Sequence, residues 1–386
     1  MSFIPYGRQD INAEDIKSVV DVLNSDFLTQ GPKVPLFEKS ISDYTNVKYS
    51  FAFNSATSAL HVACLALGVG EGDIVWTSPI SFVASANCAL YCGATVDFVE
   101  IDSKTYNLCP QELEQKLIQA KKNNSLPKVV IPVHLSGQSC DMEKIHKLSK
   151  EYGFKIIEDA SHAIGAKYQG LPIGNCKYSD ICIFSFHPVK IITSAEGGMA
   201  TTNSSELATK LDLLRSHGVT RDMNLMENES HGPWYYEQVD LGFNYRMTEL
   251  QGALGASQMN RLDEFIISRN EVVKMYNKQL SNLPVTLPYQ ESFNDSSWHL
   301  YIIRLNSGKT KFNHLETFNK LREANIGVNL HYMPIYLQPY YQKLGFKPGY
   351  LPKAEKYYSE AISIPVYSTI TKEQVQRVCD VLKDIL

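Results

Sequence analysis

Short apolar runs alternate with helical patterns between about residues 47 and 202, and this alternation limits the choice of folds more than any other feature of the chain. The runs have the β-branched and aromatic make-up of buried strands, and the segments between them repeat apolar residues at helical spacing. This pattern predicts βαβ units around a mostly parallel sheet, with helices on both faces. The expected strands lie in VKYSFAF (47–53), DIVWTS (73–78), KVVIPVHL (128–135), KIIEDAS (155–161) and DICIFSF (180–186).

The amino terminus carries a helix-start signal outside this alternating region. Asn12 is a suitable N-cap residue, and Asp15 three positions later can complete a capping box. We expect a helix that continues to Leu23 and ends before the turn residues TQGP. This segment and the alternating region together predict a large domain, residues 1–246, with an amino-terminal arm.

The rest of the chain predicts a linker and a second, smaller domain. Residues 247–280 keep a helical pattern without proline, and we expect one long helix that links the two domains. Residues 281–386 mix strand and helix patterns, which indicates a small α+β domain. Its expected elements are the strands WHLYIIRL (298–305) and VNLHYM (328–333) and the final helix KEQVQRVCDVLKDI (372–385).

Composition and charge argue against several classes of function. The formal net charge is −4 and no block of lysines or arginines is present, so we expect no nucleic-acid partner. The amino terminus lacks an apolar signal core, and the most apolar region, 74–96, is interrupted by proline, glycine and polar residues. We therefore expect no membrane span and a cytoplasmic location. Eight cysteines without a Cys-x-x-Cys pair fit free thiols and argue against a zinc or other metal site.

One lysine stands where the predicted sheet would bind a ligand. The segment FSFHPVKIITSAEGG (184–198) places Lys190 shortly after a buried-type strand and before a Glu-Gly-Gly corner. In open α/β sheets, ligands bind at the carboxyl ends of the strands. Most lysines are solvated loop residues, but a lysine at this edge can also clamp a phosphate, act as a general base or form a Schiff base.

Small polar residues open an expected helix in the segment NSATSALHVACLALG (54–68). Backbone amides and the hydroxyls of Ser55, Thr57 and Ser58 would gather at its amino terminus, which suits a phosphate group. The same residues also serve as ordinary helix caps. Neither Gly-x-x-x-x-Gly-Lys nor Gly-x-Gly-x-x-Gly is present, so a nucleotide hydrolase or a simple dinucleotide enzyme is poorly supported.

Two acids, Glu158 and Asp159, end another buried-type strand and are followed by Ser161 and His162. A carboxylate at a strand end commonly caps a helix or pairs with an arginine, and it can also keep a heteroaromatic nitrogen protonated. A metal site is a weaker alternative, because no regular spacing of histidines or carboxylates accompanies the pair. We expect a cationic or protonated group to lie opposite these acids.

These separate segments together match the needs of pyridoxal phosphate, which requires a lysine for its Schiff base, an acid for its ring nitrogen and an anchor for its phosphate. Lys190 would form the Schiff base and then carry the transferred proton, and Asp159 would keep the ring nitrogen protonated. Phe82, in TSPISFVAS (77–85), is placed to stack on the ring, although a core position is the commoner fate of such a residue.

A series of motifs follows the same order as in a known family. The motifs are NSATSALH, SPISFVA, IPVHLSG, IEDASHAIGA, FSFHPVKIITSAEGG, RSHG and LGFNYRMTELQGALG. Over essentially the whole chain the sequence resembles the DegT/DnrJ-type sugar aminotransferases, pyridoxal phosphate enzymes of the aspartate-aminotransferase fold. The resemblance implies fold type I, with a mostly parallel central sheet and a smaller α+β C-terminal domain. It also implies transamination, because in the sugar 3-dehydratases of this family a histidine replaces the lysine that is Lys190 here.

The resemblance implies roles for individual residues. Lys190 and Asp159 are the catalytic residues, Phe82 stacks on the cofactor ring, and His162 lies by its phenolic oxygen. In the family the asparagine of FNYR, here Asn244, reaches the phosphate of the neighbouring subunit's cofactor, which implies a homodimer with shared active sites. Within one chain, the implied phosphate-binding residues are Ser55, Ala56, Thr57, Ser58 and Ser185.

A narrower resemblance concerns the substrate. SDFLTQGPKV, SSWHLYII, HYMPIYLQPYYQKLGF and AEKYYSEAISIP are similar to family members of the pseudaminic acid pathway, which aminate the 4-keto group of UDP-4-keto-6-deoxy-N-acetyl-β-L-altrosamine with glutamate. The implied substrate-binding residues are Tyr6, Arg221, His331 and Tyr332. For the diphosphate we favour Arg221 over Arg246, although each could instead pair with a nearby acid, Asp222 or Glu249.

Two alternatives stay open. The chain could aminate another nucleotide sugar, such as UDP-4-keto-6-deoxy-GlcNAc or a dTDP-linked 4-keto hexose, with the same catalytic residues. It could also be a non-catalytic regulatory or binding protein on the same fold, although the presence of both Lys190 and Asp159 counts against this.

Overall fold

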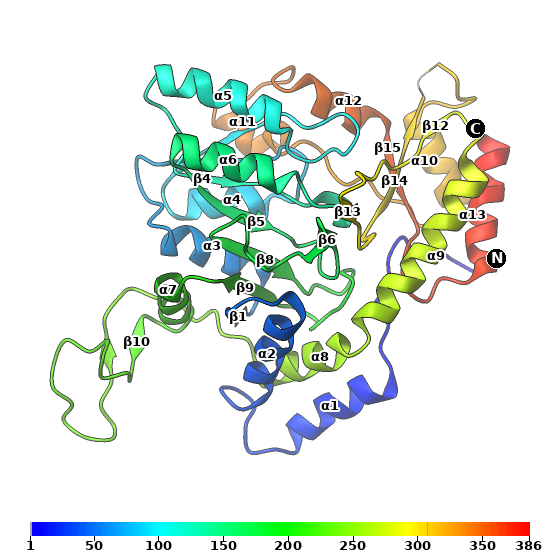
Figure 1. Cartoon of the computed structure of the whole chain (residues 1–386). Coiled ribbons are helices and arrows are strands. Elements are labelled where there is room, and N and C mark those ends of the chain that lie inside the picture. The colour runs from blue at the N-terminus through cyan, green and yellow to red at the C-terminus, as the bar shows by residue number, and fades with distance from the viewer. Residues whose placement is uncertain (1, 307) are drawn as a thin grey trace.

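A seven-stranded sheet forms the centre of the computed structural model, which describes residues 2–306 and 308–386 (Figure 1). Its strand order is β1-β9-β8-β5-β4-β2-β3. The strands from β8 to β3 are parallel, whereas β9 runs antiparallel to both of its neighbours. The mostly parallel sheet is confirmed; β3 and β9 are strands that the sequence pattern did not predict. The strands span Tyr49–Phe53 (β1), Ile74–Thr77 (β2), Thr95–Phe98 (β3), Val129–Ile131 (β4), Lys155–Asp159 (β5), Ile181–Ser185 (β8) and Gly198–Thr202 (β9).

Helices cover both faces of this sheet, because successive strand residues point to opposite sides. Trp76 and Ile156 belong to a core shared with α2, α5 and α6, whereas their neighbours Val75 and Ile157 belong to a core shared with α3, α4 and α7. The predicted α/β architecture is therefore confirmed. These helices span Lys33–Thr45 (α2), Ala56–Ala66 (α3), Ala84–Tyr91 (α4), Pro110–Lys122 (α5), Met142–Tyr152 (α6) and Ser205–Arg215 (α7).

The predicted amino-terminal helix is present as α1 (Ala13–Leu23), and it starts with the expected capping box. The Asn12 side chain accepts the Asp15 backbone N–H at 2.9 Å, and the Asp15 carboxylate accepts the Asn12 N–H at 3.0 Å. Asp15 is fully buried and also receives hydrogen bonds from Gln258 at 2.7 Å and Arg261 at 2.6 Å. These bonds attach α1 to a segment 243 residues further along the chain.

The expectation of one long helix over 247–280 is wrong, because the structure contains two helices there, α8 (Glu249–Met259) and α9 (Leu262–Leu280). The backbone leaves helical geometry at Arg261, where φ is −113°. The Arg261 guanidinium is held by Asp15 at 2.6 Å, so the helix is interrupted where this side chain turns toward α1. α8 then lies beside α1 and α2, while α9 continues along the C-terminal part of the chain (Figure 1).

A second, antiparallel sheet of β12, β14 and β15 organises the C-terminal part of the chain. It packs with α9, α10 and α13 around a core that includes Tyr276, Ile303 and Val378. The expected strand WHLYIIRL contains β14, and the expected final helix matches α13 residue for residue. The bounds are Val285–Thr286 (β12), Tyr301–Leu305 (β14), Ala361–Ile364 (β15), His314–Glu323 (α10) and Lys372–Ile385 (α13).

The expected strand VNLHYM is wrong: this segment forms only an isolated bridge between Asn329 and Ser363. The two residues exchange backbone hydrogen bonds of 3.2 and 2.8 Å. Strand pairing stops there because the backbone groups of the following residues either bond to other partners or lack a hydrogen-bond donor. The Tyr357 hydroxyl donates to the His331 carbonyl oxygen, and Pro334 has no backbone N–H.

Short elements complete the fold. The β10–β11 hairpin projects from the body of the molecule next to α7 (Figure 1). Within the described residues, none of the helices combines the length and the apolar character needed to cross a bilayer. The remaining elements are Lys167–Tyr168 (β6), Leu171–Pro172 (β7), Val219–Thr220 (β10), Glu237–Gln238 (β11), Asn294–Asp295 (β13), Pro339–Lys343 (α11), Pro352–Glu360 (α12) and the 3₁₀ turns Leu135–Gly137 and Ile335–Leu337.

Gly198, the first residue of β9, is packed too closely to admit a side chain. A Cβ atom at this position would lie 2.6 Å from backbone atoms of Ser55 and Ala56, where α3 begins. The glycine therefore lets the start of α3 rest directly on the central sheet, which explains part of the Glu-Gly-Gly corner in the sequence.

We expect Gly198→Ala to lower the free energy of unfolding by about 1–3 kcal/mol, because backbone atoms must shift to admit the methyl group. Urea unfolding followed by circular dichroism measures this change. Gly70→Ala is the matched control, since no atom lies within 4 Å of a Cβ placed there. Equal effects of the two substitutions would contradict the close packing of β9 on α3.

Candidate active site

Lys190 follows β8, as the sequence predicted, and lies in a turn where its N–H donates to the His187 carbonyl oxygen at 2.9 Å. The residue is half-buried. Burial lowers the pKa of Lys190 to about 8, because the ammonium group loses hydration, and the charge of Asp159 acts in the opposite direction. Lys190 therefore has a larger neutral, nucleophilic fraction than a solvated loop lysine would have.

Asp159 ends β5, the strand next to β8, and is only 4% exposed. Its Oδ2 accepts the Ser85 hydroxyl at 2.6 Å, and its Oδ1 accepts the Ser161 backbone N–H at 3.1 Å. The Ser85 hydroxyl in turn lies 2.7 Å from that of Ser81. Among residues 2–306 and 308–386, no arginine forms an ion pair with Asp159 and no cluster of three or more potential metal ligands occurs.

His162 is buried and held as a neutral imidazole with a defined tautomer. Burial lowers its pKa well below the usual range, and the charge of Lys190 adds to the effect. Nδ1 accepts the Ser136 N–H at 3.3 Å, so the ring proton is on Nε2, which donates to the Tyr332 hydroxyl oxygen at 3.2 Å. Ser136 adopts a left-handed φ of 62°, a conformation that costs a non-glycine residue about 1–2 kcal/mol.

Tyr6, His331 and Tyr332 form an aromatic cluster next to His162. The ring centroids of Tyr6 and His331 are 5.3 Å apart, and those of His331 and Tyr332 are 4.9 Å apart. Burial and the charge of Lys190 lower the pKa of His331 to about 3, and burial raises the pKa of Tyr332. Three of the four predicted substrate-binding residues are thus close to the Lys190 site in the structure.

The start of α3 offers hydrogen-bond donors in a different part of the chain from these aromatic rings. Ser55 is the N-cap of α3, and its hydroxyl oxygen accepts the Ser58 N–H at 3.1 Å. The Thr57 hydroxyl has no hydrogen-bond partner within the described part of the chain, and the first turn carries no acidic residue. Ser185 in β8 pairs with Gly198 in β9, and Gly198 packs against Ala56 at the start of α3. The five predicted phosphate-binding residues therefore lie together. The Ser55 contact is also an ordinary helix cap, so the phosphate-site interpretation and the helix-cap interpretation both apply to this residue.

Phe82 is not a core residue. Its side chain is 61% exposed, although it immediately precedes α4, whose residue Ser85 binds Asp159. A large aromatic ring that is exposed beside a buried carboxylate has a free face for stacking. The core interpretation of Phe82 is therefore wrong, and its position is compatible with the expected contact to a planar ring.

Neither Arg221 nor Asn244 forms a side-chain hydrogen bond or an ion pair with a residue of the Lys190 cluster in the described part of the chain. Arg221 is exposed in the hairpin that projects beside α7, and it forms no ion pair with another described residue (Figure 1). Asn244 is also exposed, and its backbone bridges Ser216.

The alternative ion pairs of the two candidate arginines are not formed. Arg221 does not pair with Asp222, whose carboxylate accepts a backbone N–H within its own turn at 2.9 Å. Arg246 does not pair with Glu249, which accepts the Lys33 N–H at 2.6 Å at the start of α2. Arg246 instead donates to a serine hydroxyl at 3.0 Å.

Ser85, Ser136 and His299 belong to the site, although the sequence analysis does not single them out. The sequence contained a signal for Ser85, because this residue follows Phe82 by three positions, a spacing that places side chains on one side of a helical turn. Ser136 and His299 had none, since both act by contact with a residue distant in sequence. The His299 ring is 4.3 Å from that of His162, and the residue is only 4% exposed.

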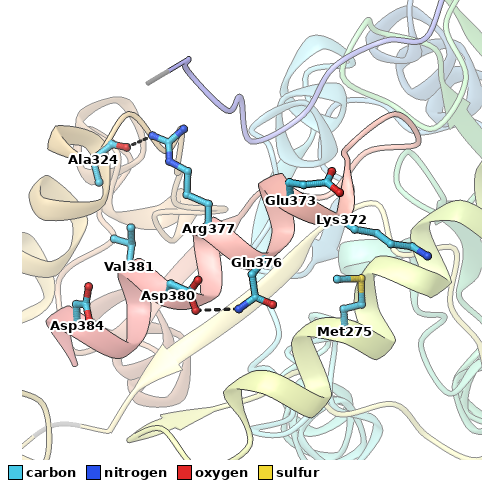
Figure 2. Close-up of a pocket in the computed structure, with 9 residues that line it drawn as sticks. All are labelled: Met275, Ala324, Lys372, Glu373, Gln376, Arg377, Asp380, Val381 and Asp384. Carbon is cyan, nitrogen blue, oxygen red and sulfur yellow. Dashed lines mark hydrogen bonds between the residues drawn. The ribbon is translucent and has the colours of Figure 1, made fainter.

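A surface groove on the C-terminal part of the chain is not part of this site. Figure 2 shows the groove, which has a volume of about 670 Å³ and is lined mainly by α13. Its charged side chains have both signs, and Arg377 is already bound to the Ala324 carbonyl oxygen. None of the residues of the Lys190 cluster lines it.

The residues around Lys190 fit the cofactor that the sequence predicted. Lys190 supplies a primary amine, Asp159 supplies a buried carboxylate held by two donors, and Phe82 supplies an exposed aromatic face. The start of α3 supplies hydroxyl and amide donors without a competing acid. An amine, an acid and an anion site are the three groups that pyridoxal phosphate requires.

Comparison with known proteins identifies the family. Residues 9–383 match the model of the DegT/DnrJ/EryC1/StrS aminotransferase family. The UDP-4-amino-4,6-dideoxy-N-acetyl-beta-L-altrosamine transaminase of Campylobacter jejuni is 37% identical over 384 residues, which cover 99% of this chain and 97% of that protein. The spore coat polysaccharide biosynthesis protein SpsC of Bacillus subtilis is 36% identical, over 100% of this chain and 97% of that protein.

Solved structures agree with the sequence relatives. Helicobacter pylori PseC, an aminotransferase involved in the biosynthesis of pseudoaminic acid, superposes with a TM-score of 0.90 at 33% identity over 99% of both chains. The PLP form of the putative sugar aminotransferase Spr1654 from Streptococcus pneumoniae gives a TM-score of 0.88 at 29% identity over 100% of both chains. The chain therefore belongs to the DegT/DnrJ/EryC1/StrS family and is a pyridoxal phosphate-dependent sugar aminotransferase.

Proposed function

We propose that this enzyme transfers an amino group from glutamate to the 4-keto carbon of UDP-4-keto-6-deoxy-N-acetyl-β-L-altrosamine, in pseudaminic acid biosynthesis. The observation that carries the proposal is the placement of Lys190 and Asp159 at the adjoining ends of β8 and β5, which supplies the amine and the acid for transamination. The names of the relatives from Campylobacter jejuni and Helicobacter pylori support this substrate.

We assign the chemical roles to the residues around Lys190. Pyridoxal phosphate held by these residues would supply an electron sink, which would let a proton leave the carbon that bears the amino group. The neutral amine of Lys190 takes up that proton and returns it. Asp159, fixed by Ser85 and Ser161, keeps the ring nitrogen protonated, and His162 presents an N–H donor rather than a second positive charge.

The proposed enzyme is a homodimer with shared active sites. α1 exposes Ile16, Val20 and Leu23, with exposed fractions of 58%, 44% and 57%. Their spacing places them on one side of the helix, so they form an apolar stripe that a second copy of the chain can cover. Asn244 is exposed and lacks a side-chain partner among the described residues, which leaves it available to a cofactor phosphate held by the other subunit.

We assign the recognition of the nucleotide diphosphate to Arg221 in this dimer. The hairpin that follows Arg221 exposes apolar side chains, including Met223 at 76% and Trp234 at 71%. An exposed apolar hairpin is suited to packing against a second subunit, and it would carry the unpaired arginine to that subunit's substrate. Tyr6, His331 and Tyr332 would face the sugar from the chain that holds Lys190.

We also propose the domain division suggested by the sequence, with a large domain at 1–246, a linking segment at 247–280 and a small domain at 281–386. The antiparallel sheet and its own hydrophobic core support the last boundary. The linking segment is two helices rather than one. Ile4 packs into the C-terminal core, so the amino-terminal arm spans both domains. The eight free cysteines support a reducing, cytoplasmic location.

A second candidate function is the amination of another 4-keto nucleotide sugar. The specific observation that favours it is the similarity to SpsC and to a UDP-4-amino-4-deoxy-L-arabinose–oxoglutarate aminotransferase of Shewanella sediminis, which is 32% identical over 393 residues. The same lysine and aspartate would serve this reaction, so the two candidates differ only in the residues that contact the sugar and the nucleotide.

We expect the cofactor-free protein to combine with pyridoxal phosphate at a rate that rises with pH around a midpoint of about 8. Only the neutral amine attacks the aldehyde, and burial makes this form of Lys190 available below the ordinary lysine pKa of about 10.4. The growth of the visible absorbance band gives the rate. Free Nα-acetyl-lysine, treated identically, corrects for the titration of the cofactor itself, and Lys190→Ala should develop no band. A midpoint near 10 for the protein contradicts the assigned environment.

We expect Asn244→Ala to weaken cofactor binding by about 10- to 100-fold, because a hydrogen bond to a charged group contributes about 1.5–3 kcal/mol. Equilibrium dialysis gives the affinity, and sedimentation velocity gives the oligomeric state. Asn282→Ala, at another exposed asparagine, is the matched control. Tight cofactor retention by a monomer would refute the shared site.

We expect turnover with UDP-4-keto-6-deoxy-N-acetyl-β-L-altrosamine to exceed that with other 4-keto nucleotide sugars in a panel assay. Arg221→Ala should raise the KM for the UDP-sugar by about 10- to 100-fold and leave the KM for glutamate unchanged, because a charge-assisted hydrogen bond to the diphosphate is lost. Arg322→Ala, at an exposed arginine on α10, is the control. Turnover with dTDP-sugars alone would overturn the substrate assignment but not the aminotransferase chemistry.

A further inference from the structure

Three cysteines gather where α3 packs against α4, outside the site described above. Cys64 belongs to α3, Cys88 belongs to α4, and Cys92 caps the C-terminal end of α4. The Cys92 sulfur lies 3.2 Å from the Cys88 carbonyl oxygen and 4.0 Å from that of His61, which precedes Cys64 by one helical turn. Both other cysteines lie close enough to the Cys64 thiol to raise its pKa.

The three thiols differ in their exposure to solvent. Cys64 and Cys88 are completely buried, whereas Cys92 is half-buried. A hydrogen bond from the Cys64 thiol lowers the pKa of Cys92, with a further contribution from His61 and against the effect of burial. The same contacts and burial raise the pKa of Cys64. Cys92 is therefore the less buried and the more acidic thiol of the two, which makes it the better nucleophile.

We propose that Cys64 and Cys92 form a reversible disulfide when the protein meets a hydroperoxide. In the first step the Cys92 thiolate attacks the O–O bond, so that an S–O bond forms, the O–O bond breaks and hydroxide leaves as water after protonation. In the second step the Cys64 sulfur attacks the Cys92 sulfenic acid, so that the S–S bond forms, the S–O bond breaks and water leaves with the Cys64 proton. Two thiols lose two electrons, and one hydrogen peroxide becomes two waters.

Cys64, rather than Cys88, is the partner for geometric reasons. Cys88 and Cys92 lie four residues apart at the end of one helix, where Cβ atoms are about 5–6 Å apart. A disulfide needs a Cβ–Cβ separation of about 3.5–4.5 Å. Cys64 comes from the neighbouring helix, so helical spacing does not fix its distance from Cys92.

The link would join two helices that both begin at the active site. The first turn of α3 contains Ser58, and the first turn of α4 contains Ser85, which binds Asp159. The cysteines sit toward the opposite ends of these helices, so the oxidised form ties together two elements that position the catalytic acid and the phosphate-binding residues.

The experiment treats the holoenzyme with hydrogen peroxide and counts thiols after denaturation. We expect the count to fall by two from the eight cysteines of the chain, a Cys64–Cys92 peptide to appear in non-reducing mass spectrometry, and dithiothreitol to restore both thiols. Cys64→Ser should leave a sulfenic acid on Cys92 that dimedone traps. Cys88→Ser should still form the disulfide. Cys109→Ser is the matched control, because Cys109 is buried away from this cluster and burial raises its pKa.

A measurement on the unmodified chain keeps the test independent of how the variants fold. Brief exposure of the holoenzyme to iodoacetamide should alkylate Cys92 before any other cysteine and thereby prevent the peroxide-induced cross-link. Earlier alkylation of another cysteine would overturn the proposal, as would a cross-link that includes Cys88 or the absence of any cross-link after peroxide treatment.

Discussion

The parallel pairing of β5 with β8 is the constraint on which the active site depends. In this register Asp159 lies opposite Ile183, and both strands end at the same edge of the sheet. The segment that leaves β8 therefore carries Lys190 to the place where the Asp159 carboxylate is already fixed. Burial at this edge of the sheet, and not the charge of Asp159, is what lowers the pKa of Lys190.

The site balances its charges by keeping its histidines neutral. His162, His299 and His331 are all buried, and in each case burial and the charge of Lys190 act together to lower the pKa. A second cation there would repel the ammonium form of Lys190 and compete with it for the Asp159 carboxylate. Neutral imidazoles avoid this cost and still provide hydrogen bonds, as the contact from His162 to Tyr332 illustrates.

Features with a local cause could be predicted from the sequence, and features with a distant cause could not. The capping box at Asn12, the final helix and the position of Lys190 after a strand follow from nearby residues and agree with the structure. The break at Arg261 depends on Asp15, 246 residues earlier. β9 has the sequence GMATT, whose β-branched residues are polar threonines, so the pattern does not indicate a buried strand. Its burial comes from its neighbours in the sheet. The contact of His299 with His162 likewise exists only in the folded chain.

Part of the substrate recognition is separate from the chemistry in the proposed enzyme. The groups that handle the proton sit on β5, β8 and α4, which are fixed by the central sheet and its two cores. Arg221 and Asn244 lie on exposed segments whose position at an active site depends on the partner subunit in the proposed dimer. A change in the projecting hairpin can therefore alter which nucleotide sugar binds without disturbing the catalytic lysine.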